Sequence, residues 1–405
     1  MVEGTCEAAF REVGDLFEAQ LADGGGGGVA VYSRGRPVVD LWGGVADEES
    51  GRPWVQDTTV MAFSTTKGVA STALHVCVDR GLLAVDDRVA DHWPEFAQGG
   101  KAEITVRQVL CHEAGLYDIT SLLASAEQLL DWDAMAAALE RAEPAFTPGS
   151  ANAYHAVTYG FLVGELVRRV SGVGISEFVA REIAGPLGLD GAYVGTPDDQ
   201  LDRVAPLIQP PGLADVLRTD GRSDGGASSG IVELAASLGY EIHPEVTRAA
   251  FGFAQLRELA STPEALRHPI PSFNGTFTAR SLARMYAALG AGGTLDGVTL
   301  MSPETIAAAT EIQNDRPDLA IVFPMHWRLG YHGVFTTAGI PERAFGHMGL
   351  GGSGAWTDPD RELAVALVVN RLGANLVGDD RLMAIGGAAI RAADAVDAAA
   401  EPSGS

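Results

Sequence analysis

The chain has 405 residues, of which 46% are hydrophobic and 20% are charged, a balance that predicts a folded protein large enough for two packed domains rather than a disordered chain. Its 53 acidic and 28 basic side chains give a formal net charge of −25, which repels phosphate backbones and anionic lipid surfaces and so argues against nucleic acid or a membrane as a partner. The N-terminal segment has neither the basic nor the apolar region of a signal peptide, and we expect a cytoplasmic protein.

The first predicted elements open a sheet. An amphipathic helix is expected over about residues 4–22, followed by a glycine-rich turn at 24–28 that lacks the Lys-Ser/Thr pair of a phosphate-binding loop. Residues 29–44 alternate between apolar and polar side chains, as in a hairpin with its turn at Arg34-Gly35.

The middle and the end of the chain differ in pattern. From Ser64 to Arg80 an apolar helix is expected, and helical patterns dominate to about residue 290, interrupted by a polar loop at 213–231. Two apolar strands then surround an Asp358-Pro359-Asp360 turn, and a helix follows over about 379–398.

These elements predict an α/β fold, in which an antiparallel sheet is flanked by helices and joined to a mainly helical lobe. We expect residues 1–72 and 285–405 to form the sheet domain and residues 73–284 the helical domain.

The three cysteines, Cys6, Cys77 and Cys111, are an odd number scattered far apart, which argues against a disulfide framework and fits a reducing compartment. Cys77 and Cys111 lie in apolar helical stretches and are expected to be packing residues. Cys111 and His112 are adjacent in sequence, and neighbours on a helix do not face each other, so we do not expect a thiol nucleophile there.

The pattern Ser64-Thr65-Thr66-Lys67 opens the apolar helix, and residues three apart share one helix face, so a hydroxyl and an amine can meet. Ser64 could instead be a plain N-cap and Lys67 a solvated charge. A cation is disfavoured in the first helical turn, however, and a lone solvated lysine fits poorly in a helix that is apolar nearly all round. The chain has only one other lysine, Lys101. Because lysine, unlike arginine, can give up its proton when desolvated, the pattern favours a Ser-Lys dyad.

Five stretches, in chain order between about residues 28 and 371, resemble the serine β-lactamase and penicillin-binding-protein-like superfamily, most closely its carboxylesterases with a class C β-lactamase fold, the family VIII esterases. They are VAVYSRGRPVVDLWGGVAD, FSTTKGVASTALHVCVDRGLL, ITVRQVLCHEAGL, TPGSANAYHAVTYGFLVGELVRRVSG and FGHMGLGGSGAWTDPDRELAVALVVNR.

The resemblance implies roles for individual residues. Ser64 matches the nucleophile, Lys67 its partner, and Tyr154 the tyrosine of a Tyr-x-Asn-like motif, where the residues alone would also allow a half-buried packing tyrosine. His347-Met348-Gly349 matches the third motif of the family, after which the backbone N–H of Leu350 would join that of Ser64 as oxyanion hole.

Two departures from the β-lactamase pattern concern substrate recognition. Ala156 stands where β-lactamases usually have an Asn that helps hold the substrate amide, and His347-Met348 replaces the Lys-Thr pair that receives the β-lactam carboxylate. The nucleophilic residues are kept while residues for anion and amide recognition are not, and that combination resembles the esterases.

The resemblance therefore implies a serine carboxylesterase that hydrolyses short- to medium-chain esters through an acyl-enzyme on Ser64, with no metal or organic cofactor. Alternatives on the same fold are an acyltransferase, a β-lactamase or D-amino-acid peptidase, and a penicillin-binding-like module that binds without turnover. A further alternative is an α/β-hydrolase with Ser228 as nucleophile, because residues 226–230 fit G-x-S-x-G. That motif needs a strand before it, whereas the residues before position 226 are expected to form a polar loop. The oligomeric state cannot be predicted from the sequence.

Overall fold

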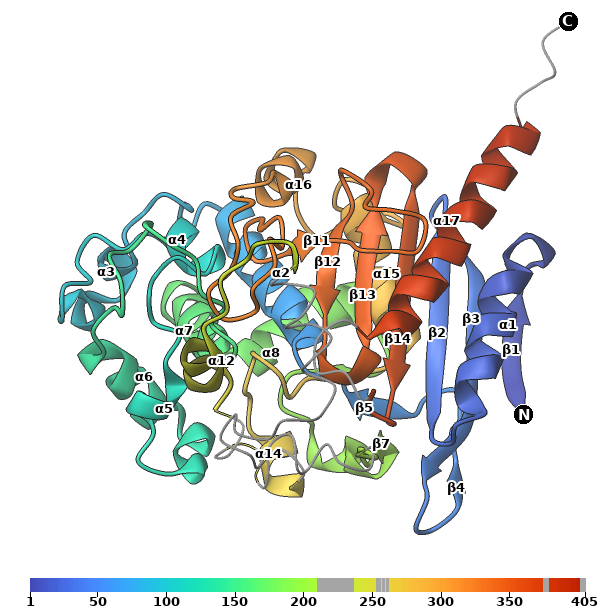
Figure 1. Ribbon diagram of the computed structural model, residues 1–405, viewed down its shortest axis with the longest axis horizontal. Coiled ribbons are helices and arrows are strands. Elements are labelled where there is room, and N and C mark those ends of the chain that lie inside the picture. The colour runs from blue at the N-terminus through green and yellow to red at the C-terminus, as the bar shows by residue number, and fades with distance from the viewer. Residues whose placement is uncertain (210–236, 253–255, 257–258, 260–261, 374–378, 401–405) are drawn as a thin grey trace, which may run out of the picture.

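The computed structural model describes residues 1–209, 237–252, 256, 259, 262–373 and 379–400. A large sheet occupies one side of the molecule and a group of helices the other (Figure 1). The strands of this sheet are β1 (Val2–Cys6), β2 (Gly26–Ser33), β3 (Arg36–Asp47), β4 (Arg52–Pro53), β11 (His332–Gly333), β12 (Phe345–Met348), β13 (Gly354–Asp358) and β14 (Leu363–Val369).

The order of the sheet is β1-β3-β2-β14-β13-β12-β11, with β4 paired to β3, and every pairing is antiparallel. The first and last parts of the chain thus share one sheet, and the predicted α/β fold is confirmed. A smaller sheet has the order β6 (Ala192–Tyr193), β8 (Thr276–Phe277), β5 (Thr59–Met61), β7 (Val204–Ala205), and β9 (Thr294–Leu295) pairs with β10 (Val298–Thr299).

Helices cover the large sheet and predominate on the other side of the molecule (Figure 1). The α-helices are α1 (Arg11–Leu21), α2 (Thr65–Asp79), α3 (Val89–His92), α4 (Val106–Leu110), α5 (Ile119–Leu122), α6 (Trp132–Arg141), α7 (Thr158–Ser171), α8 (Ile175–Val179), α9 (Gly185–Leu187), α12 (Pro244–Phe251), α14 (Pro263–Arg267), α15 (Ala279–Gly290), α16 (Pro303–Thr310) and α17 (Asp380–Ala400). Short 3₁₀ or π segments are Ala8–Phe10, Pro94–Ala97, Ala126–Leu130, Ala180–Ala184, Asp198–Arg203, Leu350–Gly352 and Pro359–Arg361.

The alternation of side chains along β14 explains how helices pack on both faces of the sheet. Leu363, Val365 and Leu367 belong to the core shared with α1 and α17, whereas Ala364 and Ala366 face the core on the α15 side. Successive side chains of a strand point to opposite faces, and small alanines allow a helix to approach closely. The sheet is therefore buried on both faces, which explains why β14 is apolar throughout.

The predicted hairpin is confirmed, with Arg34 at φ 53° and Gly35 at φ 75° forming its two-residue turn. The helix expected over about 4–22 is wrong at its start, because residues 2–6 form β1, and α1 begins only at Arg11. Pairing with the open edge of β3 satisfies the backbone groups of that segment, which outweighs its helical pattern. The glycine-rich turn is confined to Gly24 and Gly25, and β2 starts at Gly26.

Helix α2 lies between the large sheet and the helical side of the molecule, in contact with β12, α7 and α8 (Figure 1). Every residue from Thr65 to Cys77 is buried, as its apolar pattern predicts. The predicted domain boundary at residue 72 falls inside α2, and the division into two domains stays a prediction. The polar loop at 213–231 lies outside the described residues.

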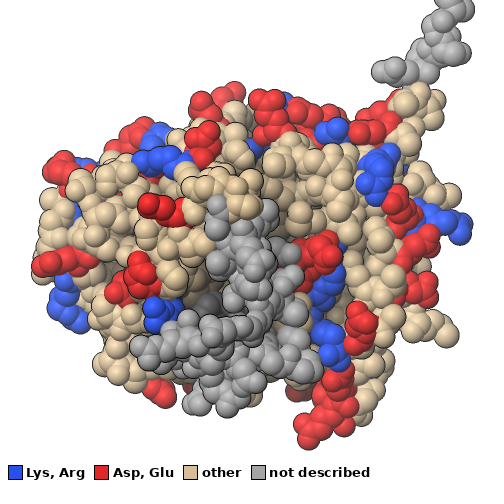
Figure 2. Space-filling model, in the orientation of Figure 1, with Lys and Arg blue, Asp and Glu red and all other residues tan. Residues whose placement is uncertain are grey.

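Acidic and basic side chains are interspersed around the rim of the face shown in Figure 2. Within the described ranges, no helix is both long enough and apolar enough to cross a membrane.

Candidate active site

A sharp turn between β5 and α2 presents Ser64. Phe63, directly before it, has φ 47°, a left-handed conformation that is uncommon for a residue other than glycine and is concentrated at functional sites. Thr66 fixes the turn, since its hydroxyl donates to the carbonyl of Phe63 (2.6 Å) and accepts from the N–H of Gly275 (3.0 Å). Ser64 occupies the N-cap position, yet its side chain makes no capping hydrogen bond. The hydroxyl is therefore not used to cap the helix.

Lys67 is completely buried one helical turn after Ser64. Its Nζ lies 3.3 Å from Oγ of Ser64 and donates to the carbonyl oxygens of Ala156 (2.7 Å) and Ser272 (2.9 Å). All three are neutral acceptors, and burial lowers the pKa of Lys67 well below its ordinary value of 10.5. The amine is thereby able to exist uncharged and to take up a proton.

Tyr154 completes this group from the segment that leads into α7. Nζ of Lys67 lies 4.8 Å from the centroid of its ring, and the side chain is almost fully buried. Burial raises the pKa of Tyr154 above 10, while a hydrogen bond with Ser64 opposes that rise. The phenol therefore stays protonated near neutral pH and can donate a proton beside Ser64.

The end of β12 lies directly against the turn that carries Ser64. A Cβ on Gly349 would stand 2.1 Å from the carbonyl oxygen of Ala62 and 2.9 Å from Oγ1 of Thr65, so only glycine fits there. Among the described residues, neither the N–H of Ser64 nor that of Leu350 donates to a protein acceptor. Two free amides at this junction are what an oxyanion hole requires.

His347 of β12 is buried beside this group. Its Nδ1–H donates to the carbonyl of Met348 (2.9 Å), while Nε2 is buried without a hydrogen-bond partner among the described residues. Burial, followed by the neighbouring His332 and Lys67, lowers the pKa of His347 well below 6.5. His347 is therefore neutral at pH 7 and offers an acceptor rather than a positive charge.

Seven site residues are predicted from the sequence: Ser64, Lys67, Tyr154, Ala156, His347, Gly349 and Leu350. The structure brings them together from the start of α2, the segment before α7 and the end of β12. Ala156 contacts Lys67 through its backbone carbonyl rather than through a side-chain amide. Ser228 lies outside the described residues.

Several neighbours of this group were not found by sequence reasoning. Trp327 stacks on Tyr154 with ring centroids 5.7 Å apart and planes at 10°, and His112 lies 4.8 Å from the same ring. Ser272 accepts from Lys67 through its carbonyl and from the N–H of Gly160 through Oγ (2.6 Å). The glycine at position 160 is the one sequence feature that could have indicated the contact between α7 and Ser272. A Cβ at this position would lie 2.3 Å from the nitrogen of Ser272.

The cysteine interpretation agrees with the geometry. Burial raises the pKa of the Cys77 thiol to about 12 and raises that of Cys111 further, so both thiols are poor nucleophiles. His112 points into the ring cluster around Tyr154 and makes no hydrogen bond to Cys111.

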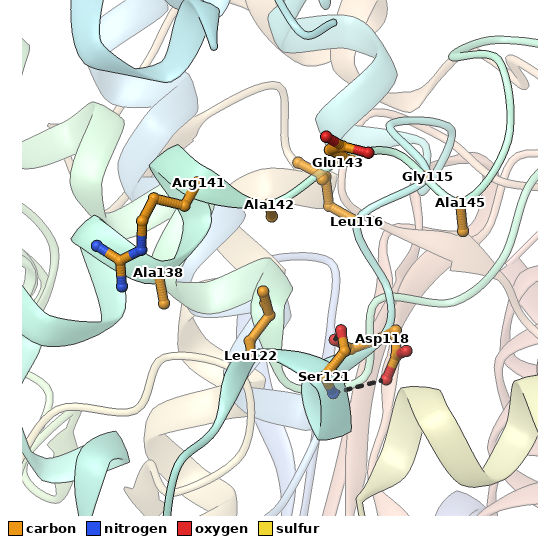
Figure 3. Close-up of a pocket in the computed structure, with 10 residues that line it drawn as sticks. All are labelled: Gly115, Leu116, Asp118, Ser121, Leu122, Ala138, Arg141, Ala142, Glu143 and Ala145. Carbon is orange, nitrogen blue, oxygen red and sulfur yellow. Dashed lines mark hydrogen bonds between the residues drawn. The ribbon is translucent and has the colours of Figure 1, made fainter. Parts of the chain in front are cut away.

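A separate hollow of about 380 Å³ lies on the helical side of the molecule, where residues of α5 and α6 and of the loops next to them line it (Figure 3). Ser64, Lys67 and Tyr154 are not among its lining residues. The backbone of Leu116 links it to the segment around Tyr154, because its N–H donates to Nε2 of His155 (3.0 Å) and its carbonyl accepts from the hydroxyl of Thr158 (2.7 Å).

The family described as Beta-lactamase matches residues 13–389. The protein named Esterase/beta-lactamase LipL from Mycobacterium tuberculosis is 39% identical over 371 residues, which cover 89% of this chain and 81% of that protein.

Solved structures resemble the whole described fold. A family VIII carboxylesterase has a TM-score of 0.84 at 33% identity, with 97% of this chain and 100% of that chain covered. A penicillin-binding protein homologue from Caulobacter crescentus has a TM-score of 0.82 at 38% identity, with the same coverage.

Proposed function

The chain is a hydrolase of the beta-lactamase family, and from this premise we propose that it is a serine carboxylesterase acting through an acyl-enzyme on Ser64. The observation that carries the proposal is the 3.3 Å approach of Nζ of Lys67 to Oγ of Ser64, at a buried position where the hydrogen-bond acceptors of the amine among the described residues are all neutral. A desolvated lysine without a counter-ion is suited to act as a base.

In the acylation step, uncharged Lys67 accepts the proton of Ser64, and Oγ attacks the carbonyl carbon of the ester. The negative charge that forms on the carbonyl oxygen is held by the backbone N–H groups of Ser64 and Leu350. Tyr154 donates its proton to the departing alkoxide and regains one from Lys67, so the alcohol leaves neutral while the acyl group stays on Ser64.

Deacylation reverses these roles. A water molecule attacks the acyl carbonyl and loses one proton, which the phenol of Tyr154 takes up as it passes its own proton to uncharged Lys67. Lys67 then returns a proton to Oγ of Ser64 as the bond between Oγ and the acyl carbon breaks and the acid departs. The raised pKa of Tyr154 keeps its phenol protonated at rest, and the lowered pKa of Lys67 leaves the amine as the resting base.

The preference for neutral esters is supported by the third motif. A β-lactam carboxylate is favoured by a permanent cation and a hydroxyl, whereas this site offers neutral His347 and the thioether of Met348. The ring of Phe251, which packs on Tyr154 and is only partly buried, adds apolar surface suited to a short or medium acyl chain. The names of the relatives, an esterase/beta-lactamase and a family VIII carboxylesterase, point the same way.

The direct test is to incubate the protein with a fluorophosphonate and locate the adduct by peptide mass spectrometry, alongside turnover of p-nitrophenyl esters of two to twelve carbons. The proposal expects a single adduct on Ser64 and hydrolysis that is fastest for the shorter chains. An adduct on another serine, or no ester turnover by a protein that is labelled on Ser64, would contradict it. Adding an alcohol acceptor to the same assay separates hydrolysis from acyl transfer.

A further inference from the structure

Asp318 is a buried carboxylate next to the catalytic group that the mechanism above does not use. Its exposed fraction is 2%, and within the described part of the chain no cationic side chain pairs with it. Burial raises the pKa of this carboxyl group, and the effects that oppose the rise are hydrogen bonds from N–H groups. Burying a carboxylate without a cationic partner costs folding free energy. We therefore infer that Asp318, with its four hydrogen-bond donors, has a specific role.

Those donors come from two segments. Oδ1 accepts from the backbone N–H of Tyr154 (3.0 Å), Ala320 (2.8 Å) and Ile321 (3.1 Å), and Oδ2 accepts from the side-chain amide of Asn152 (3.0 Å). The N–H of Leu319 in turn donates to the carbonyl of Asn152 (3.0 Å). One carboxylate thus joins the segment that carries the phenol to the turn at 318–322.

The opposite side of the same segment is held by His112. Its carbonyl accepts from the N–H of Ala153 (3.0 Å) and its Nδ1 from the N–H of His155 (3.1 Å). Residues 152 and 154 therefore bind Asp318 while 153 and 155 bind His112, as expected for an extended segment clamped between two supports. Tyr154 sits at the centre of this clamp.

The turn that carries Asp318 also contacts α12, the helix that lies beside the phenol of Tyr154. Thr247 of α12 donates to the carbonyl of Ala320 (2.6 Å), and Phe251 of the same helix lies 5.9 Å from the ring of Tyr154. Val322 has φ 73°, a strained conformation for a β-branched residue, and strain of this kind is concentrated at functional sites.

We propose that Asp318 is the positioning residue for Tyr154, holding its backbone so that the phenol stays within reach of the leaving alcohol. The inference rests on the proposed esterase function. An asparagine at this position keeps one oxygen acceptor and turns an N–H₂ group toward the donors on its other side. Either the backbone donors, Tyr154 among them, or the amide of Asn152 then lose their acceptor, and all four donors lose the negative charge that they share. Because the phenol serves as proton donor, the substitution should lower kcat/KM mainly for substrates whose leaving group needs a proton.

The test compares Asp318→Asn with the wild type on two butyrate esters. For ethyl butyrate, whose alkoxide must be protonated, kcat/KM is expected to fall on the order of a hundredfold. For p-nitrophenyl butyrate, whose phenolate leaves without a proton, the fall is expected to be roughly threefold or less, by the same reasoning. A role in folding alone would lower both rates by one common factor, and that result would overturn the proposal.

The matched control is Asp358→Asn, which removes an equally buried carboxylate at the end of β13, paired with Arg361 (2.8 Å). It should lower stability and leave the ratio of the two kcat/KM values unchanged. If Asp318→Asn does not fold, Asn152→Ala removes one donor from the same clamp and should change that ratio in the same direction. An unchanged ratio in a folded Asn152→Ala variant would then overturn the proposal.

Failure of the esterase function is distinguishable from failure of this inference. If the wild type turned over neither ester, the proposed function would be wrong. The rate of Ser64 labelling by a phosphonate diester, which carries no fluoride and loses a simple alkoxide, would still measure proton donation by Tyr154. Equal labelling rates in the wild type and Asp318→Asn would then overturn the positioning role.

Discussion

The side chains of Ser64 and Lys67, three residues apart on one face of α2, meet with Oγ and Nζ separated by 3.3 Å. The remaining hydrogen bonds of Nζ go to two backbone carbonyls, so the amine is desolvated and no anionic group of the described residues bonds to it. This relationship determines which changes to the protein should remove activity and which should not.

Replacement of the nucleophile separates the two candidate serines. Ser64→Ala should reduce hydrolysis of p-nitrophenyl butyrate to background, because no other described hydroxyl lies within hydrogen-bond reach of the Lys67 amine. Ser228→Ala should keep nearly full activity. Initial rates with the two purified variants decide the matter, and an active Ser64→Ala enzyme together with an inactive Ser228→Ala enzyme would contradict the assignment.

Lys67→Arg should lower kcat by a factor of about 10² or more, because arginine keeps the charge but cannot cycle a proton. The control is Lys101→Arg, since Lys101 is also fully buried and donates to the carbonyls of Gln98, Glu140 and Ala142 without touching Ser64. Both variants carry the same steric change. Comparable kcat values in the two folded variants would show that Lys67 contributes only its positive charge and does not act as a base.

The pH profile of kcat/KM should report the lowered pKa of Lys67. The active form has Lys67 uncharged, so kcat/KM should fall as pH falls through that pKa and should reach a plateau well below pH 10.5, the ordinary lysine value. Rates with a neutral ester across the stable pH range give the profile. A rate that keeps climbing through pH 10.5 would mean that the amine is not desolvated as its burial indicates.

The third motif predicts poor turnover of β-lactams. Loss of one charge-assisted hydrogen bond to the substrate carboxylate costs about 1.5–3 kcal/mol, or roughly ten- to a hundredfold in affinity. A neutral ester loses nothing by the absence of that bond. Steady-state kinetics with nitrocefin and p-nitrophenyl butyrate should give the ester the higher kcat/KM, and the opposite order would favour a β-lactamase.

Buried histidines predict that stability falls in mild acid. Burial lowers the pKa of His75, His155 and His332 from 6.5 to about 4. Between those two values the unfolded chain binds more protons than the folded one, so stability is fully present above pH 6.5 and is lost as pH falls toward 4.

His75→Gln tests this prediction, because glutamine can still donate to the carbonyl of Leu329, which His75 Nε2 contacts at 2.7 Å. Between pH 7 and pH 5 the variant should lose on the order of 1–2 kcal/mol less unfolding free energy than the wild type. Urea unfolding at the two pH values measures the difference. Equal losses in both proteins would show that His75 takes up no proton on unfolding in this range.

The sequence alone was enough for the elements whose pattern is local. The apolar helix after Ser64, the hairpin around Arg34-Gly35 and the C-terminal helix follow from periodicity and turn residues within a few positions. Residues 2–6 have a helical pattern in the sequence, and the prediction of a helix there was wrong. Their structure is decided instead by pairing with β3, some forty residues away.

The candidate site shows the same division between residues predictable from local sequence and residues that depend on distant segments. Ser64 and Lys67 could be paired from their spacing because an α-helix fixes the geometry of residues three apart. Tyr154 and the third motif needed the resemblance to a family, since nothing in their local sequence says which loop or strand end faces Ser64. Asp318, Ser272 and Trp327 were not predicted at all.

What the sequence by itself determined was thus the α/β class, the buried helix α2 and the dyad on it. Only the tertiary structure decided the rest: that Lys67 meets neutral carbonyls, that His347 is an uncharged acceptor, and that Asp318 clamps the segment of Tyr154. The physical reason is that burial and hydrogen-bond partners set charge states and positions. For Lys67 and Asp318 these partners come from segments that lie 89, 164 and 205 residues away in the chain.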